Sequence, residues 1–340
     1  FNTKEGTISA LRKVKDAEYQ YNGSTVIPAY FDYWNLMQFF GAAREDENGN
    51  YVDREREPET LEALKFLNQL YREGLLPEDS ETLSRDQLQE KVNAGSVFAY
   101  TQYLVRPDSL MNDDPDALMV HVGPIQGDQG NEFYFDPSPV AGWTLSMITK
   151  NAERPDRIIR LFEYLYQEEM SLNAYHGPRG YAWEYTDDGN IKYTEQRQRD
   201  FAEDYSAAER KYGNGTVIWL INWIPIMRTW PVPETPGEKT TNLAEKYYEQ
   251  FSYNDLAFST INPQGGSKEA RIQARIDEFR EMEYAKMLFA SSEEEVERIF
   301  KSMPEQEAKL GYDKLYSFKN AQFQAAKERL GIDFAWPGNR

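Results

Sequence analysis

The sequence predicts a helix-rich α/β fold with two lobes, and three observations support this. Short apolar runs such as Thr25–Pro28 and Val97–Tyr100 have the length and composition of strands. They alternate with longer segments in which apolar residues recur every three or four positions, as on one face of a helix. The 340 residues, 40% of them hydrophobic, are enough for two globular cores. Because strands alternate with helices and no internal repeat is evident, we expect layered α/β units rather than a repeat array.

Three helices with clear boundaries are predicted in the first half of the chain. Residues 6–17 carry apolar side chains on one face. Pro58–Tyr71 has a proline in its first turn, a leucine at every third position from 61 to 70, and Gly74 beyond its end. Ser84 and Gln87 have the spacing of a capping box, so they open a third helix, which an Asn-Ala-Gly turn closes.

Further strands and hairpins are predicted between and after these helices. Asp46–Asn50 is rich in turn-forming residues and precedes a Tyr-Val pair, which predicts a hairpin turn. A short strand is expected within Pro115–Val122 and another over Val140–Thr149. Tyr185–Tyr193 contains Asp-Asp-Gly between two aromatic segments and therefore predicts a second hairpin.

The second half is predicted to be mainly helical. Pro155–Met170 has a strong apolar stripe and reads as one helix. Prolines between positions 231 and 236 indicate an irregular connection. From Ser267 onward almost every segment favours a helix, and Ser292 with Glu295 has the spacing of a second capping box.

Composition excludes several classes of function. The formal charge of −19 argues against nucleic-acid binding, which needs a basic face. No apolar run reaches the roughly 18 residues of a membrane span. The chain has no cysteine, so disulfides, thiol nucleophiles and cysteine-ligated zinc are excluded. In contrast, 23 Tyr, 18 Phe and 7 Trp supply many rings that could stack on the apolar faces of sugars.

No pattern in the sequence picks out catalytic residues. His121 and His176 are the only histidines, and neither lies beside a Gly-x-Ser-x-Gly motif. Two histidines without cysteine also make a zinc site improbable. We therefore expect no catalytic residues, no metal and no cofactor. The 57 carboxylates leave a carbohydrate-active enzyme open as an alternative, because an acid/base pair cannot be excluded by count.

The order of several segments resembles the extracellular solute-binding proteins of carbohydrate ABC importers, especially the long lipoprotein type that includes alginate-binding proteins. The segments that carry the resemblance are Asn35–Ala42 with the Asn-Gly hairpin after it, Pro58–Leu76, Val92–Tyr100, Val140–Thr149 with the Pro155 helix, Gly177–Tyr181 with the Asp188-Gly189 hairpin, and the C-terminal helices. Each motif is weak alone, but the ordered set spans nearly the whole chain.

The resemblance implies a periplasmic-binding-protein-like fold whose two lobes close around a ligand at a hinge. Residues 1–125 would form the first segment of the second lobe and 126–145 the hinge crossing. Residues 146–235 would form a first-lobe segment with a cleft wall, and 236–340 a helical part mainly of the second lobe. Members of the family carry an additional N-terminal part that builds most of the first lobe. The first lobe, and half of the usual cleft, would then be incomplete in these 340 residues.

The resemblance also implies a binder rather than an enzyme: the subunit of an ABC importer that captures an oligosaccharide and passes it to permease subunits. Such a protein would be a monomer, lipid-anchored on the extracellular face of the membrane or periplasmic. A binding protein for peptides or another non-sugar solute is the second alternative. Many relatives have a calcium loop of alternating Asp and Asn, but Asp16–Ser24 lacks that pattern, so we expect no calcium there. Asp46–Asn50 is better explained as a turn.

The strongest predicted binding cluster is Trp219, Trp223, Arg228 and Trp230. Three tryptophans and an arginine within twelve residues, interrupted by prolines, do not suit a helix buried on all sides. Their rings would stack on sugar faces, and Arg228 would bind hydroxyls or a carboxylate. The family also places ligand-contacting aromatics here. The alternative is core packing with a surface arginine.

A second predicted group lies where two buried strands end. Tyr100, Gln102 and Tyr103 follow the strand at 97–100, at the strand end where α/β proteins bind ligands. The family places a stacking residue here, and Tyr103 or Gln102 would take its position. Trp34 follows the strand at 25–28, and its family analogues approach the ligand. The alternatives are an ordinary strand end and a core tryptophan.

Two further candidates come from the predicted hinge and from a loop. Trp143 follows a glycine on the return strand and would line the cleft or pack at the hinge, with packing favoured. Arg179 and Tyr181, followed by Trp183, lie in a glycine-bounded loop that would contact ligand from the first lobe.

Overall fold

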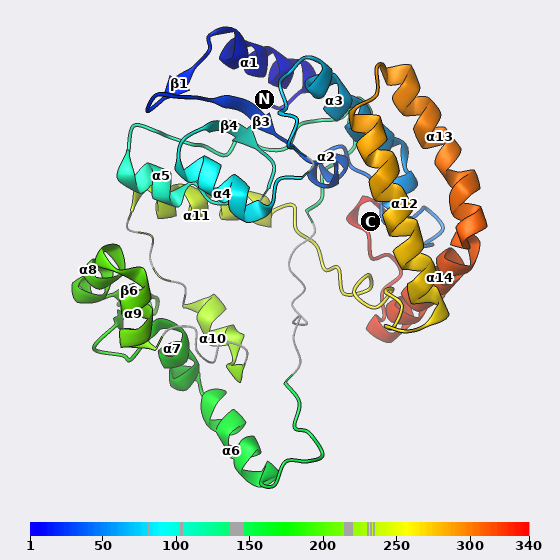
Figure 1. Ribbon diagram of the computed structural model, residues 1–340. Coiled ribbons are helices and arrows are strands. Elements are labelled where there is room, and N and C mark those ends of the chain that lie inside the picture. The colour runs from blue at the N-terminus through cyan, green and yellow to red at the C-terminus, as the bar shows by residue number, and fades with distance from the viewer. Residues whose placement is uncertain are drawn as a thin grey trace. The chain divides into compact units, whose positions relative to one another are not determined.

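The computed structural model describes residues 1–80, 82–102, 105–135, 146–213, 220–229, 231, 233 and 235–339 (Figure 1). The chain forms two compact units. Unit 1 comprises Phe1–Ala141 together with Thr235–Arg340, and unit 2 comprises Gly142–Glu234. The chain therefore leaves unit 1 and returns to it, with one boundary inside the predicted crossing 126–145 and the other beside position 235. The assignment of the units to lobes stays a prediction.

The N-terminal part of unit 1 is an α/β layer. Its strands are β1 (Gln20–Tyr21), β2 (Ser24–Thr25), β3 (Ile27–Tyr30) and β4 (Val97–Tyr100), and its helices are α1 (Lys4–Asp16), α2 (Tyr33–Phe39), α3 (Pro58–Arg72), α4 (Arg85–Asn93) and α5 (Asp108–Asp113), with a 3-10 turn η1 at Arg54–Arg56. β1 pairs with β2 antiparallel, and β3 pairs with β4 parallel. The predicted strand Thr25–Pro28 is thus divided between β2 and β3.

Local chemistry sets the helix boundaries in this layer. Helix α3 begins at Pro58, as predicted, and its apolar stripe buries Leu64, Leu67 and Leu70. The predicted capping box of α4 is present: the Ser84 hydroxyl accepts from the backbone N–H of Gln87, and the Gln87 side chain accepts from the N–H of Ser84. Leu67 and Leu70 of α3 pack with α1, α2 and β3 in one core, whereas the buried face of α4 packs with β3 and β4 in another.

The C-terminal part of unit 1 is helical, as predicted. It contains α11 (Pro236–Glu249), α12 (Lys268–Leu288), α13 (Glu293–Leu310), α14 (Tyr312–Leu330) and a 3-10 turn η3 at Pro337–Asn339. Helices α12 and α13 run side by side (Figure 1). The predicted second capping box is only half formed. The Ser292 hydroxyl accepts from the N–H of Glu295, but the Glu295 carboxylate accepts from the N–H and hydroxyl of Ser291 instead.

A buried ion cluster joins this helical part to the chain before α3. The guanidinium of Arg280, 4% exposed, donates to Glu307 at 2.6 Å and to Asp53 at 2.7 Å. Its third carboxylate partner, Glu55, lies 3.5 Å away. Arg56 donates to the second oxygen of Glu307 at 2.6 Å. Residues more than 200 positions apart are therefore held by charge-assisted hydrogen bonds that must stay paired once buried.

Glu57, which precedes α3, is half-buried and its side chain does not cap that helix. Burial, with smaller contributions from the charges of Glu59 and Asp53, raises the pKa of Glu57 to about 7. The folded state therefore disfavours the charged carboxylate, so Glu57 destabilises the protein progressively as pH rises from about 4.5 to about 7. Below that window the group is protonated in both states and contributes nothing.

We expect Glu57→Gln to stabilise the protein by about 1–2 kcal/mol at pH 8, a value reduced from the full pKa shift because the group is partly solvated. At pH 4 the gain should vanish. Urea unfolding of both proteins at the two pH values measures this difference. A gain of equal size at pH 4 and pH 8 would show that burial of charge is not its cause.

Unit 2 contains a hairpin surrounded by short helices. Its elements are α6 (Pro155–Leu165), α7 (Glu168–His176), β5 (Trp183–Tyr185), β6 (Ile191–Tyr193), α8 (Glu195–Glu203), α9 (Tyr205–Tyr212) and α10 (Trp223–Arg228). The predicted hairpin is confirmed, with Tyr185 opposite Ile191. The predicted helix Pro155–Met170 is wrong in one respect, since it divides at residues 166–167 into α6 and α7. The core of the unit surrounds Trp183, which is fully buried.

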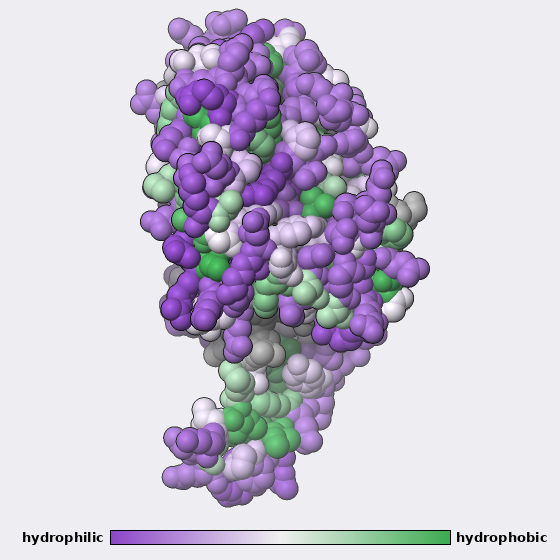
Figure 2. Space-filling view, turned by 90° about the vertical axis from the view of Figure 1, so that its right-hand side faces the viewer, coloured by the Kyte–Doolittle hydropathy of each residue, from purple (hydrophilic) through white to green (hydrophobic). Residues whose placement is uncertain are grey.

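Helix α6 buries its apolar stripe only in part. No residue of α6 is fully buried, and Ile159 and Leu161 are about half exposed. Figure 2 shows hydrophobic residues, drawn green, at the surface toward the lower end of the view, where unit 2 lies. A helix of such strong amphipathic pattern normally buries that stripe; here Ile158 and Phe162 are half-buried, and Leu165 packs against the core of unit 2.

The strand predicted within Pro115–Val122 is wrong, because the described residues there form no ladder. Of Val140–Thr149, the structure describes only 146–149, and these form no strand. Among the described helices, none is both long enough and apolar enough to cross a membrane.

Candidate functional site

The parallel pairing of β3 and β4 brings two strand ends to one edge of unit 1. Tyr30 lies opposite Tyr100 in the register, and the N–H of Thr101 donates to the carbonyl of Tyr30 at 3.2 Å. The residues that follow each strand therefore emerge together. This is the edge where ligands of α/β proteins bind, and we call residues 30–38 with 100–102 the strand-end site.

Asp32 organises the strand-end site. One carboxylate oxygen caps helix α2 by accepting from the N–H of Asn35 at 2.9 Å. The other accepts from the Asn35 side-chain amide at 2.8 Å, from the Thr101 hydroxyl at 2.7 Å and from the Gln102 amide at 3.4 Å. Thr101 in turn accepts from the N–H of Asp32 at 3.1 Å. Asp32 thus fixes the loop after β3 to the loop after β4.

Trp34 is the exposed ring of this site. It lies in the first turn of α2, and 45% of its surface is exposed, which excludes the predicted alternative of a core tryptophan. Its carbonyl accepts from Gln38 one turn later at 3.1 Å. A large exposed ring on a helix that Asp32 anchors is a rigid apolar platform beside hydrogen-bonding side chains, which is the combination that a sugar face requires.

Tyr100 and Gln102 lie at the same edge but differ in whether their side-chain hydrogen-bonding groups are available to a ligand. Tyr100 is half-buried, and its hydroxyl donates to the carbonyl of Val105 at 3.2 Å. Burial, and then the charge of Asp108, raise the pKa of Tyr100. This side chain therefore serves the local fold. Gln102 makes one long hydrogen bond and keeps the rest of its amide available among the described residues. Tyr103 lies outside the described residues.

In unit 2, the loop before the hairpin brings Arg179 and Tyr181 to the surface. Arg179 is exposed, and its guanidinium lies 4.8 Å from the ring centre of Tyr185. Tyr181 is 49% exposed and packs against Tyr212. The neighbouring Trp183 is 0% exposed, and its indole N–H donates to the carbonyl of Gly177 at 2.7 Å. Trp183 therefore belongs to the core rather than to a ligand site.

The predicted tryptophan-rich cluster is described only in part. Trp223 opens α10, is half-buried, and packs edge-on against Tyr175 with ring centres 5.2 Å apart. Arg228 ends the same helix and is exposed. Trp219 and Trp230, like Trp143 of the predicted hinge, lie outside the described residues. Within unit 2 the structure thus places Trp223 partly against the core and Arg228 at the surface, and the rest of the predicted cluster stays a prediction.

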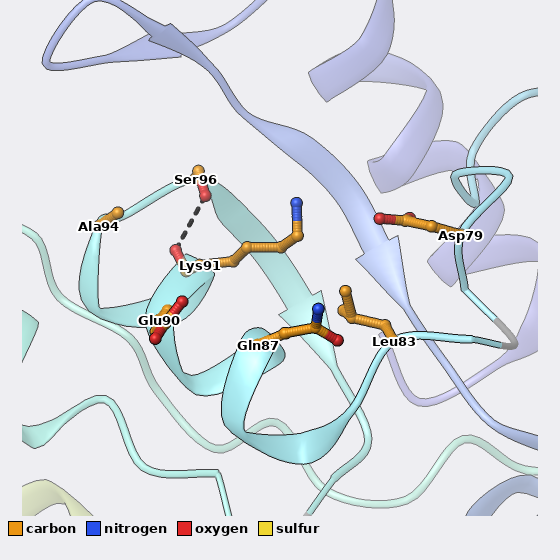
Figure 3. A pocket seen from close by; sticks show the side chains of 7 residues that line it. All are labelled: Asp79, Leu83, Gln87, Glu90, Lys91, Ala94 and Ser96. Carbon is orange, nitrogen blue, oxygen red and sulfur yellow. Dashed lines mark hydrogen bonds between the residues drawn. The ribbon is translucent and has the colours of Figure 1, made fainter.

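A hollow on unit 1 was not predicted from the sequence. It has a volume of about 420 Å³, and α4 and the preceding loop line it with Asp79, Leu83, Gln87, Glu90, Lys91, Ala94 and Ser96. Figure 3 shows Lys91 and Asp79 pointing toward one another across it. Asp79 also accepts from the hydroxyl of Tyr30 at 3.1 Å. None of the seven lining residues is aromatic, so the hollow lacks a stacking platform.

The described residues contain no group of three or more His, Asp or Glu side chains that could hold a metal ion. At the predicted turn, Asp46 accepts from the N–H of Asn48 at 2.9 Å and of Asn50 at 2.8 Å. Burial alone would raise the pKa of Asp46, but these bonds, those of the Asn50 side chain and the charge of Lys327 lower it. The oxygens of Asp46 are therefore used by the turn itself.

Neither histidine has a catalytic environment among the described residues. His176 is fully buried, its Nδ1 lies 2.9 Å from the hydroxyl of Tyr193, and burial with the charge of Arg197 lowers its pKa to about 3. His121 packs between the rings of Tyr247 and Tyr248, and burial lowers its pKa. No described serine, threonine or carboxylate hydrogen bonds to either ring, so no nucleophile and base pair is formed.

Comparison with known proteins identifies structures that share the fold of this chain. No protein-family model matches the chain, and no curated protein sequence matches it. Solved structures do match, and the chain shares with them an α/β fold found in solute-binding proteins, several of them associated with ABC transporters. The predicted fold class is thereby confirmed.

Three of these solved structures define the similarity. A solute-binding protein of Bifidobacterium longum infantis, described as binding HMO and associated with an ABC transporter, is 16% identical, with a TM-score of 0.64 over 95% of this chain and 69% of that one. The FusA substrate-binding protein of S. pneumoniae, an EF-hand mutant in complex with fructo-nystose, is 14% identical, with a TM-score of 0.65 over 96% and 69%. The alginate-binding protein AlgQ2, solved without calcium ion, is 13% identical, with a TM-score of 0.63 over 95% and 68%.

Proposed function

We propose that the protein is the substrate-binding subunit of an ABC importer and that it captures an oligosaccharide by aromatic stacking and hydrogen bonding. The observation that carries the proposal is the strand-end site, in a chain with a solute-binding-protein fold. There the exposed ring of Trp34 lies on a helix held by Asp32, beside the polar side chain of Gln102. Neighbours of the same fold bind HMO, alginate or fructo-nystose, which supports a saccharide as the ligand.

The mechanism that follows is binding without bond-making. A ligand held in a cleft between two lobes stabilises the closed form, and the permease subunits of the importer recognise that form. Tyr103, Trp143, Trp219 and Trp230 stay predicted contacts of the cleft, as do Arg179, Tyr181, Trp223 and Arg228 of unit 2. We also propose an extracellular or periplasmic location, a lipid anchor and a monomeric state.

A ligand screen tests the proposal. Saturating ligand stabilises the folded state by RT ln(1 + [L]/Kd), about 2.7 kcal/mol at a hundredfold excess over Kd. Thermal unfolding should therefore shift upward with at least one oligosaccharide and with no peptide of similar size. Stabilisation by peptides alone would show that the ligand is a non-sugar solute. Steady release of shorter sugars at catalytic protein concentrations would identify an enzyme instead.

A further inference from the structure

The strand-end site has one charged side chain. Within residues 30–38 and 100–102, Asp32 is the only acidic residue, and there is no Lys, Arg or His. Every hydrogen bond that reaches the oxygens of Asp32 comes from a donor: the N–H and side-chain amide of Asn35, the Thr101 hydroxyl and the Gln102 amide. Both oxygens act only as acceptors, which is the pattern of a carboxylate. The site therefore contains a fixed negative charge.

One described cation, Lys91, approaches the site: its Nζ lies 6.0 Å from the ring centre of Tyr30, on the side of the hollow, where it points toward Asp79 (Figure 3). The ring of Tyr33 packs on Tyr284 with ring centres 4.6 Å apart, and the Tyr284 hydroxyl donates to Glu55 at 2.9 Å. The nearest arginine along this path, Arg280, is committed to Asp53 and Glu307. The packing around Tyr33 thus leads to a second carboxylate, Glu55, and to an arginine that is already paired.

The polar groups of the site that have no partner in the described structure can form hydrogen bonds with sugar hydroxyls. The side-chain oxygen of Gln102 has no partner among the described residues. The remaining donors, the second amide N–H of Gln102 and the indole N–H of Trp34, are neutral. Sugar hydroxyls can satisfy both kinds of group, whereas a ligand carboxylate can only accept.

We infer that the strand-end site selects neutral sugar units and disfavours uronic acids. This inference rests on the proposed function. A ligand group that binds Gln102 lies close to Asp32, because the two side chains are 3.4 Å apart. A carboxylate in that position is repelled by Asp32, whose hydrogen-bond donors in the described structure are all neutral, and part of this repulsion survives solvent screening. A neutral sugar keeps the same ring and hydroxyls without that penalty.

A matched pair of ligands tests the inference. Mannotriose and the trimannuronate of the same linkage differ only in whether carbon 6 of each ring forms a hydroxymethyl group or a carboxylate. Calorimetric titration, extended to neutral oligosaccharides such as kestose and to oligogalacturonate, should give at least tenfold tighter binding for neutral sugars, and the difference should shrink at high salt. Equal or tighter binding of the uronates would overturn the inference and leave the proposed function intact. Binding of no saccharide at all would overturn both.

Substitution at Gln102 separates charge from shape. Gln102→Lys adds a cation beside Asp32, and Gln102→Met is the control of similar length without charge. We expect the ratio of uronate affinity to neutral-sugar affinity to be about tenfold higher in the lysine variant than in the methionine variant. Because Gln102 is half-buried and makes only one long hydrogen bond, both variants should fold, as thermal unfolding will verify. An identical ratio in the two variants would place the discriminating charge elsewhere.

Discussion

Arg280→Met should lower the free energy of unfolding by about 3–5 kcal/mol at neutral pH. Arg280 is the cation that joins Asp53, Glu55 and Glu307. The side chain of Glu307 is 1% exposed and that of Asp53 is 14% exposed. Burial would raise the pKa of Asp53, and the charge of Arg280 outweighs it and lowers that pKa. Without the guanidinium, the buried carboxylates keep negative charge that too few cations compensate. This uncompensated negative charge destabilises the fold.

An exposed ion pair on the neighbouring helix is the matched control. Arg298 pairs with Glu295 at 3.5 Å, and its side chain is 71% exposed. Arg298→Met removes the same kind of group but should change stability by less than about 1 kcal/mol, because solvent screens the pair. Urea unfolding of both variants measures the contrast. If Arg280→Met is no more destabilising than Arg298→Met, the cluster does not hold the helical part of unit 1 to the chain before α3.

The same cluster should show coupling in a double-mutant cycle. Asp53→Asn alone leaves Arg280 with less compensation, and Arg280→Met alone leaves Asp53 without its partner. The double variant removes both charges, so it should be less destabilised than the sum of the two single variants by about 1–3 kcal/mol. Additive effects would indicate that the 2.7 Å contact between the two side chains contributes little to stability.

The sequence predicted the elements whose signals are local. Pro58 and the leucine stripe define α3, and the Ser84 box defines α4. The ion cluster could not be predicted in this way, since Asp53 and Arg280 are 227 positions apart and each is an ordinary charged residue in its own segment. The break between α6 and α7 was missed because the apolar stripe continues through it. Hydrophobic periodicity identifies the apolar face of a helix, but it does not indicate where one helix ends and the next begins.

The sequence predicted the aromatic candidates of the strand-end site but not Asp32, the residue that organises it. Strand order along the sequence indicated that Trp34 and Gln102 follow buried strands, and the parallel pairing brings those ends together. Asp32 was overlooked although Asp-x-x-Asn at the start of a helix is a recognisable N-cap. Its bonds to Thr101 and Gln102 depend on a tertiary contact, as does the burial of Trp183. Residue type alone could not distinguish the buried Trp183 from the exposed Trp34.

Trp34→Ala should reduce the affinity for an oligosaccharide at least tenfold, the loss expected when a central aromatic contact of about 1.4 kcal/mol or more is removed. The ring is 45% exposed, so the loss of stability should be small compared with that of a core tryptophan. Trp34→Phe retains an aromatic face and should recover part of the affinity. Calorimetric titration with the sugar that stabilises the parent protein measures all three affinities.

Tyr19→Ala is a control, because Tyr19 is also an exposed ring of unit 1, at 56%, and lies beside β1 rather than at the carboxyl ends of β3 and β4. It should bind the sugar like the parent protein. If Trp34→Ala and Tyr19→Ala bind equally well while both stay folded, the platform lies elsewhere, and the tryptophan-rich segment around α10 becomes the remaining predicted wall. If Trp34→Ala alone loses affinity, the contact is specific to the edge that Asp32 organises, since removal of an equally exposed ring outside that edge has no effect.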